Sequence, residues 1–521
     1  MKNKFLLILV IALIFGVTGC QKYFDINHDP DALEEAPLEM ILPAALAAPL
    51  YTLGGDGQII GAFWAQHWTQ STNAPQYQGY DSWQITNSTF DGRGYGALYF
   101  YGLKDLEHIR KEAEATENWT YYLIATATQS YVYQMLVDMY DQVPFSEALQ
   151  GDSGEEGAFT PHFDDGNDIY DSLLVRLDYA LSKDFTLSSN ENPGEADIVF
   201  QGNINNWIAF ANTLKLKILL RESFKNDVTA EINAIKDAAF LMNDASYDVF
   251  VEQQNKQNPM YGIAEDAHKG NITMSRTLLS VMIDDMFNDS YSIRDQRVNY
   301  LALHPKDVEE YHRALYQGDY INIDYAEDIG YLSRPRLQFD DELYYFTQAE
   351  CYFLLAEADV RFWGGANAQE YYENGVTAAF KRFSYLADYD SENEQTQIDN
   401  ILDEDDYGQW PTDNSDDAQL KIIWLQKWIS MVNIQGMEAF IEHNRTDYPE
   451  TFPIHPLDES FEDEYNFSDD RGKFTISVNN VTSDRFPRRL MCPQSEIDGN
   501  PNTPADLKNK KVYDKVWWDV N

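Results

Sequence analysis

The sequence predicts a mostly α-helical fold: an irregular solenoid of four tetratricopeptide-like helix pairs with long, largely irregular insertions. Apolar residues recur at helical spacing through several long segments of the 521-residue chain. Alanine recurs where paired helices would touch, for example at Ala125, Ala349 and Ala378, and such small side chains let helices approach closely. The regular period of tetratricopeptide repeats is absent, so we expect a solenoid with elaborations.

The N-terminus is predicted to be a lipoprotein signal peptide over residues 1–19. Lys2 and Lys4 precede an apolar run over 5–15, which would rise only ~16 Å as a helix and is too short to span a membrane. Residues 17–20, Val-Thr-Gly-Cys, resemble the bacterial lipobox, so we expect lipidation of Cys20. The alternative is an ordinary secretory signal with a cysteine there by chance. No later stretch is expected to form a transmembrane helix.

A lipidated Cys and tether over 20–30 would then lead into a single domain over 31–521. Within that domain the helix pairs are expected at about 119–183, 204–242, 341–385 and 420–444. Three parts between and after them are rich in aromatic and polar residues and are expected to be largely irregular: about 51–101, 245–340 and 445–521.

Composition excludes several classes of function. The chain has 86 acidic and 38 basic residues, a net charge of −48, so binding to the phosphates of nucleic acid is not expected. Its three cysteines show no zinc spacing, and no common catalytic or nucleotide-binding motif is present. Asp388, Asp390 and Glu392 begin like a calcium loop, but the later positions of that motif are missing. We therefore expect no catalytic residues, no metal site and no cofactor, with a structural calcium ion as a remote alternative.

The candidate ligand-binding residues lie mainly in the aromatic-rich part 51–101. An aromatic ring can stack on the apolar face of a sugar, while amide and carboxylate groups bind its hydroxyls. Arg334 could hold a ligand hydroxyl or carboxylate, although arginines there more often pair with nearby acids. The alternative for the aromatic residues is that they fill a core. The candidates are Trp64, Trp68, Tyr80, Trp83, Gln70, Asp81 and Arg334.

Six segments, taken in order, resemble motifs of the SusD/RagB family of nutrient-binding outer-membrane lipoproteins of Bacteroidetes. One of them, residues 139–148, is similar to the turn that follows a helix in that family. Any one of these motifs is weakly specific, but six of them in the family's order are strongly specific. The segments are 25–30, 122–151, 197–221, 349–376, 426–449 and 487–496.

The resemblance implies a non-catalytic, lipid-anchored protein of the outer-membrane surface. It would capture oligosaccharides or peptides in the irregular part of the molecule and pass them to a SusC-like TonB-dependent transporter. Two alternatives from other classes stay open: a surface glycan-degrading enzyme, and a tetratricopeptide-type scaffold for protein assembly.

Overall fold

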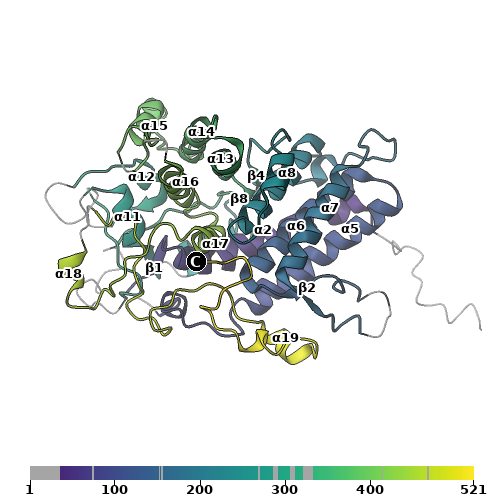
Figure 1. Cartoon of the computed structure of the whole chain (residues 1–521), viewed down its shortest axis with the longest axis horizontal. Coiled ribbons are helices and arrows are strands. Elements are labelled where there is room, and N and C mark those ends of the chain that lie inside the picture. Colours follow the sequence, from purple (N-terminus) through teal and green to yellow (C-terminus); the bar gives the residue numbers. More distant parts are fainter. Residues whose placement is uncertain are drawn as a thin grey trace, which may run out of the picture.

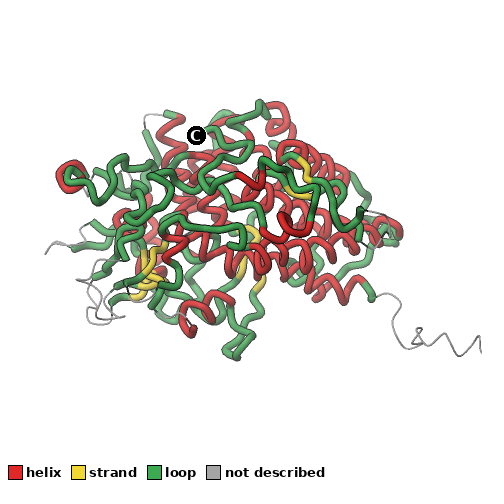
Figure 2. Tube along the Cα trace, turned by 90° about the horizontal axis from the view of Figure 1, so that it is seen from below, coloured by secondary structure: helices red, strands yellow, loops and turns green. Residues whose placement is uncertain are grey.

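Helices make up most of the ordered elements in the computed structural model, which confirms the predicted mostly α-helical class. The structure describes residues 36–521 except 73–74, 152, 154–156, 268–269, 285–290, 306–310, 321–331, 406, 413–414 and 466–468. The predicted signal peptide, the tether and the lipidation site at Cys20 lie outside the described residues. Within the described part, the sheets are short antiparallel pairs of strands (Figures 1 and 2).

The first predicted helix pair is α6 (Trp119–Tyr140) and α7 (Gly166–Leu181), which pack against each other. α5 (Lys104–Ala115) and α8 (Ile204–Glu222) also lie against α6, so nearly every residue of α6 is buried. Because neighbours cover α6 on all sides, its polar side chains, such as Gln134 and Asp138, are buried together with its apolar ones. The Asn203 side chain caps α8 by accepting hydrogen bonds from two backbone N–H groups of its first turn.

The second helix of the second pair is shorter than predicted. α9 (Thr229–Ala234) ends well before residue 242, because the chain turns back and buries Leu241 against α8. There the Leu241 backbone N–H donates to the Thr213 hydroxyl over 2.9 Å.

The later helices follow the sequence prediction more closely. α13 (Gln348–Ala358) and α14 (Ala368–Lys381) pack tightly, joined by the π-helical turn η7 (Asp359–Trp363). α16 (Asp416–Ser430) and α17 (Gly436–Thr446) follow, and α17 makes its main contacts with α3, far away in the sequence. The tetratricopeptide-like character of the pairs stays a prediction.

The expectation that residues 51–101 are largely irregular was wrong for the start and end of that segment. α2 (Leu38–Thr52), η1 (Leu53–Gly57) and α3 (Gln58–Trp64) form one long apolar stretch. It is long and apolar enough to cross a membrane by length and composition alone, which we did not expect. In the fold, however, α2 packs on α5 and α3 on α17. At the second contact a Cβ on Gly61 would collide with the Met437 backbone, so only glycine permits the approach.

Short elements complete the fold. β1 (Trp68–Gln70) pairs with β5 (Ile272–Met274), β2 (Val143–Pro144) with β3 (Phe163–Asp164), β4 (Ala245–Tyr247) with β8 (Leu343–Phe346), and β6 (Ala302–Leu303) with β7 (Arg334–Pro335). The remaining helices are α4 (Gln78–Asp81), η2 (Asp91–Tyr95), η3 (Leu98–Leu103), η4 (Gly194–Ala196), α10 (Pro259–Tyr261), η5 (Gly262–Ala267), α11 (Arg276–Met282), α12 (Arg297–Leu301), α15 (Glu394–Leu402), α18 (Phe461–Glu464), α19 (Gln494–Gly499) and η8 (Leu507–Asn509).

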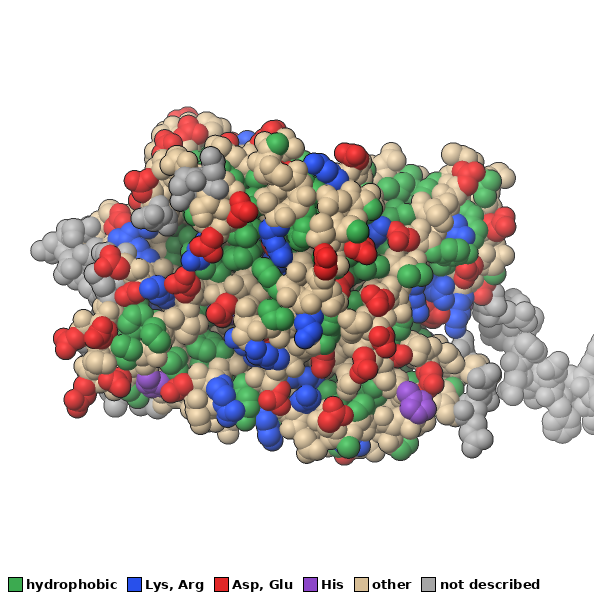
Figure 3. Space-filling model, viewed as in Figure 1, with side chains coloured by type: hydrophobic (Ala, Val, Ile, Leu, Met, Phe, Trp, Pro, Cys, Tyr) green, Lys and Arg blue, Asp and Glu red, His purple; other side chains and the backbone are tan. Residues whose placement is uncertain are grey.

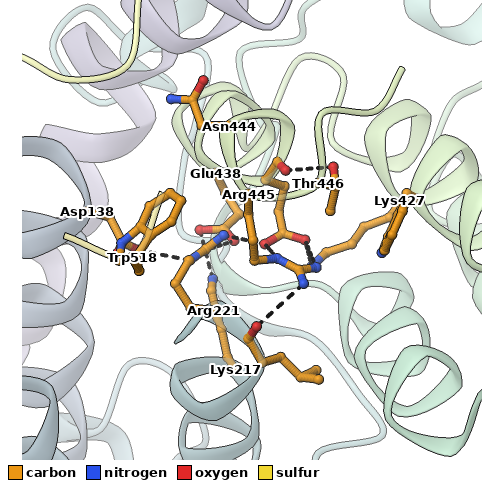
Figure 4. Close-up of polar contacts among 12 residues, drawn as sticks. Asp138, Lys217, Arg221, Lys427, Glu438, Asn444, Arg445, Thr446 and Trp518 are labelled. Atoms are coloured by element: carbon orange, nitrogen blue, oxygen red, sulfur yellow. Dashed lines mark hydrogen bonds and ion pairs between the residues drawn. The ribbon is translucent and has the colours of Figure 1, made fainter. Parts of the chain in front are cut away.

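A buried network of ion pairs joins the helices at the centre of the molecule (Figure 4). Arg221 of α8 pairs with Asp138 of α6 over 3.1 Å and with two glutamates of α17. Lys217, one turn earlier, pairs with Glu350 of α13 over 2.9 Å. Each charge is matched by an opposite one, which is the condition for burying ions at all. The network comprises Lys217, Arg221, Arg361, Lys427 and Arg445 with Asp138, Glu350, Glu357, Glu438 and Glu442.

Candidate functional site

Three of the predicted aromatic ligand contacts are buried in this structure. Trp64 is 3 % exposed and donates its indole N–H to the Tyr80 carbonyl over 3.1 Å. Trp68 is 0 % exposed, and Trp83, at 2 %, packs on Phe486 with 4.8 Å between ring centroids. No ring face of these three residues is accessible to a ligand in this structure. They lie in the core, which was the alternative prediction for the aromatic residues.

The polar candidates of the same segment are also internal. The Gln70 side chain, fully buried, donates to the Asn271 carbonyl over 2.9 Å. Asp81 accepts hydrogen bonds from the Gln70 and Gly318 backbone N–H groups and from side chains around it, and burial raises its pKa to about 7. Tyr80 alone keeps part of its ring exposed, and it stacks on Tyr77.

Arg334 is occupied by an ion pair with Glu265 over 3.1 Å. Its neighbour Arg336, two residues on, instead lines a pocket of about 310 Å³. We call this the Arg382 pocket. Five aromatic rings contribute to its wall, together with guanidinium, carboxylate and amide groups. Its lining includes Phe250, Tyr300, Arg336, Gln338, Asp340, Asp341, Glu342, Tyr344, Arg382, Phe383, Tyr385 and Asn433.

The Arg382 pocket is assembled from segments far apart in the chain. α12 supplies Tyr300, the strand β8 supplies Tyr344, and the end of α14 leads directly into residues 382–386. The turn between α16 and α17 supplies Asn433, whose side-chain oxygen accepts from the Trp68 indole over 2.9 Å. Trp68 therefore lies behind the pocket wall and positions one of its polar groups.

Arg382 is the main unsatisfied donor in the pocket wall. Its Nη2 donates to the Val432 carbonyl over 2.8 Å, while its buried Nε and Nη1 have no hydrogen-bond partner among the residues that the structure describes. Burial lowers the pKa of this arginine. A buried donor without an acceptor is destabilising, and a ligand oxygen would supply the missing acceptor once the wall beside Arg382 opened to admit it.

Carboxyl groups give the pocket its acceptors. Asp341 accepts from the Tyr385 hydroxyl and, over 2.8 Å, from the Gln338 backbone N–H. Burial raises the pKa of Asp341 and also that of Glu342. Arg336 is neutralised by a two-pronged pair with Asp388, at 2.7 and 3.0 Å. Because acids outnumber bases in the wall, the pocket suits a neutral ligand better than an anionic one.

The Tyr385 ring stands at the edge of the pocket and is 53 % exposed. It can stack on the apolar face of a sugar, while Arg382, Asn433 and the carboxylates bind hydroxyls, which both donate and accept. A volume of about 310 Å³ lies at the small end of ligand pockets, which fits one or two sugar rings.

Residues 388–392, which begin like a calcium loop, show no cation geometry in this structure. Asp388 pairs with Arg336, and Asp390 accepts hydrogen bonds from the Asn393 and Gln397 side chains. Among the described residues, no group of three or more His, Cys, Asp or Glu side chains is arranged to hold a metal ion.

Comparison with known proteins agrees with this architecture. A family model described as starch-binding and associating with the outer membrane matches residues 33–464. No match was found among curated protein sequences. A SusD homologue of Bacteroides fragilis superposes with a TM-score of 0.70 at 19 % identity, covering 93 % of this chain and 99 % of that one.

Two further solved structures show the same fold. A chitin-binding SusD homologue of Flavobacterium johnsoniae gives a TM-score of 0.69 at 19 % identity, covering 92 % of this chain and 99 % of that one. A SusD homologue of Bacteroides uniformis gives 0.66 at 20 % identity, with coverage of 92 % and 99 %. This chain therefore belongs to the SusD-like family of outer-membrane-associated proteins that bind glycans and other nutrients.

Proposed function

We propose that this protein captures neutral oligosaccharides in the Arg382 pocket, without transforming them, and delivers them to a SusC-like TonB-dependent transporter. The observation that carries the proposal is the pairing, in one pocket, of an exposed Tyr385 ring with the unsatisfied donors of Arg382. Stacking and hydroxyl recognition are the two requirements of sugar binding.

We also propose that acyl chains on Cys20 anchor the protein at the cell surface, and that binding needs no metal or cofactor. The lipobox-like residues 17–20 support the anchor. Labelling of the wild-type protein by a radioactive fatty acid, and its loss in Cys20→Ala, would test it. Affinity unchanged by a chelator would support the absence of a metal.

The chitin-binding relative suggests N-acetylglucosamine oligomers as the first ligands to test. Calorimetric titration of residues 21–521 with these oligomers, neutral glucans, acidic glycans and peptides would identify the cargo. Saturable heat with a neutral oligosaccharide supports the proposal. Binding of peptides alone, or formation of shorter products over time, would contradict it in favour of peptide capture or a glycan-degrading enzyme.

Two variants test the site itself. Tyr385→Ala and Arg382→Met are each expected to weaken the neutral oligosaccharide about tenfold or more, because one removes the stacking ring and the other the donors. Tyr179→Ala is the matched control: Tyr179 is also exposed and bonded to a carboxylate, Glu114, but lies on α7 outside the pocket. Wild-type affinity in both pocket variants would refute the assignment of the Arg382 pocket.

A further inference from the structure

A second pocket, of about 360 Å³, opens between α5, α6, α7 and the chain that follows β2. It shares no lining residue with the Arg382 pocket. We call it the Arg176 pocket. Figure 3 shows Lys and Arg side chains gathered over the region that Figure 1 draws as α5, and a second group of them at the lower centre of the same face.

Cations outnumber anions in the lining of this pocket. Among the lining residues that the structure describes, Arg110, Lys111 and Arg176 face one carboxylate, that of Glu107. In a chain with a net charge of −48, a pocket lined by excess positive charge runs against the overall field. Such a local excess attracts a negatively charged group.

The lining carboxylate is already satisfied without Arg176. Glu107 receives two hydrogen bonds of 2.9 Å from Arg110 and lies 3.7 Å from Lys111. It also accepts from the Gln129 side chain over 3.1 Å. Glu114, a second acidic residue beside these cations, lies 3.4 Å from Arg110. Two acids thus pair with two of the three cations, and one positive charge is left over.

That charge is on Arg176. Its guanidinium lies 4.2 Å from the centroid of the Phe145 ring, and its polar contact is a long hydrogen bond of 3.4 Å to the Gln129 oxygen. The nearby carboxylate of Asp164 is taken up by the Ser146 hydroxyl and by the Phe145 and Ser146 backbone N–H groups. Desolvation lowers the pKa of Arg176, and the like charge of Arg110 lowers it further. An oxyanion beside Arg176 would oppose both effects, because its negative charge stabilises the charged guanidinium.

We propose that the Arg176 pocket is a second binding site, for a small oxyanion group such as the carboxylate of an acidic sugar. Arg176 would hold the oxyanion in a charge-assisted hydrogen bond, and Lys111 at the rim would add attraction. Ser146 and Gln150 lie in the same wall and can bind hydroxyls, while Tyr133 and Phe145 supply ring surface. The inference is independent of glycan capture at the Arg382 pocket.

Calorimetric titration of residues 21–521 with glucuronate, inorganic sulfate and glucose at low salt tests the proposal. We expect saturable, mutually competitive binding of the two anions and no binding of glucose to this pocket. Tighter binding of glucuronate than of sulfate would identify an acidic sugar as the ligand. The reverse order would identify a free inorganic anion at the same site.

Arg176→Gln should weaken both anions about tenfold, as expected for the loss of one charge-assisted hydrogen bond. The matched control is Lys183→Gln, which removes the same charge from a cation–π pair with Tyr179 outside the pocket and should leave affinity within about twofold. Lys111→Gln is a second variant. The Lys111 side chain is 47 % exposed, so the substitution should not impair folding, and it should weaken anion binding less than Arg176→Gln does. Absence of saturable anion binding, or equal affinities in wild type and both pocket variants, would overturn the proposal.

Discussion

Replacing Arg221 by methionine removes the arginine that links α6, α8 and α17 in the buried network. Methionine keeps much of the side-chain volume, so the change is mainly one of charge and hydrogen bonding. It leaves Asp138 and the α17 carboxylates Glu438 and Glu442 with one cation fewer. Removing one partner of a buried ion pair usually costs about 3–5 kcal/mol.

The expected shift in melting temperature follows from the size of the protein. At about 2.1 cal/mol/K per residue, a chain of this length that unfolds as one unit has an unfolding entropy of about 1 kcal/mol/K. A loss of about 3–5 kcal/mol therefore lowers Tm by about 3–5 °C. Differential scanning calorimetry measures this directly, and urea unfolding gives the free energy independently.

The loss should also depend on pH. Burial raises the pKa of Asp138 to about 6 even beside Arg221, and removing that cation raises it further. At low pH the variant can protonate Asp138 and so avoid an unpaired buried charge, whereas at higher pH it cannot. The difference in stability between wild type and variant should therefore grow from pH 5.5 to pH 8.

Lys421→Met is the matched control, because Lys421 forms ion pairs with Asp417 and Glu450 at the surface. It should change stability by about 1 kcal/mol or less. If Arg221→Met were no more destabilising than this control, the buried network would not hold the helices together as argued.

Three further perturbations test the same structure. Trp68→Ala should lower the free energy of unfolding by about 3–5 kcal/mol, because its fully buried indole also holds Asn433; an unchanged urea midpoint would contradict this. Gly61→Ala should destabilise by about 3 kcal/mol or more, since its Cβ meets the backbone of α17, while Gly92→Ala, with open space around it, should be neutral in thermal melts. Acidification should remove stability as the pH falls from about 4.5 towards 2: burial alone would raise the pKa of Glu357, but the pair with Arg445 holds it at about 2, so the unfolded chain takes up the proton first. Circular dichroism along a pH series would measure this, and Glu357→Gln should flatten the profile in that range.

The sequence predicted α7, α14 and α17, which have a clear apolar stripe, and equally α6 and α8, which do not. The stretch α2–α3 was missed because Pro43 and Pro49 lie inside it and a glycine-rich π-helical turn interrupts it, and such residues usually mark the end of a helix. α9 ended early because a tertiary contact, the Leu241 turn against Thr213, overrides the local pattern.

The candidate site was harder to predict, for a physical reason. The segment 51–101 is rich in aromatic residues, and composition does not distinguish aromatic residues that bind a ligand from those that fill a core. The Arg382 pocket brings together Tyr300, Tyr385 and Asn433, which are separated by many residues and share no motif. The one sequence signal near the pocket was the Arg334–Pro335–Arg336 pair of arginines, and of the two only Arg336 reaches it.

The equal number of positive and negative charges in the buried network affects how copies of the protein approach one another. Its five cations are matched by five anions, so the network itself carries no net charge and the whole surplus of 48 negative charges lies outside it. Neighbouring copies therefore repel one another over about one Debye length, which is ~8 Å at physiological ionic strength and ~3 Å at 1 M salt. Crowded molecules therefore stay further apart at low salt than at high salt. The salt concentration thus sets how densely a layer of this protein can cover a surface.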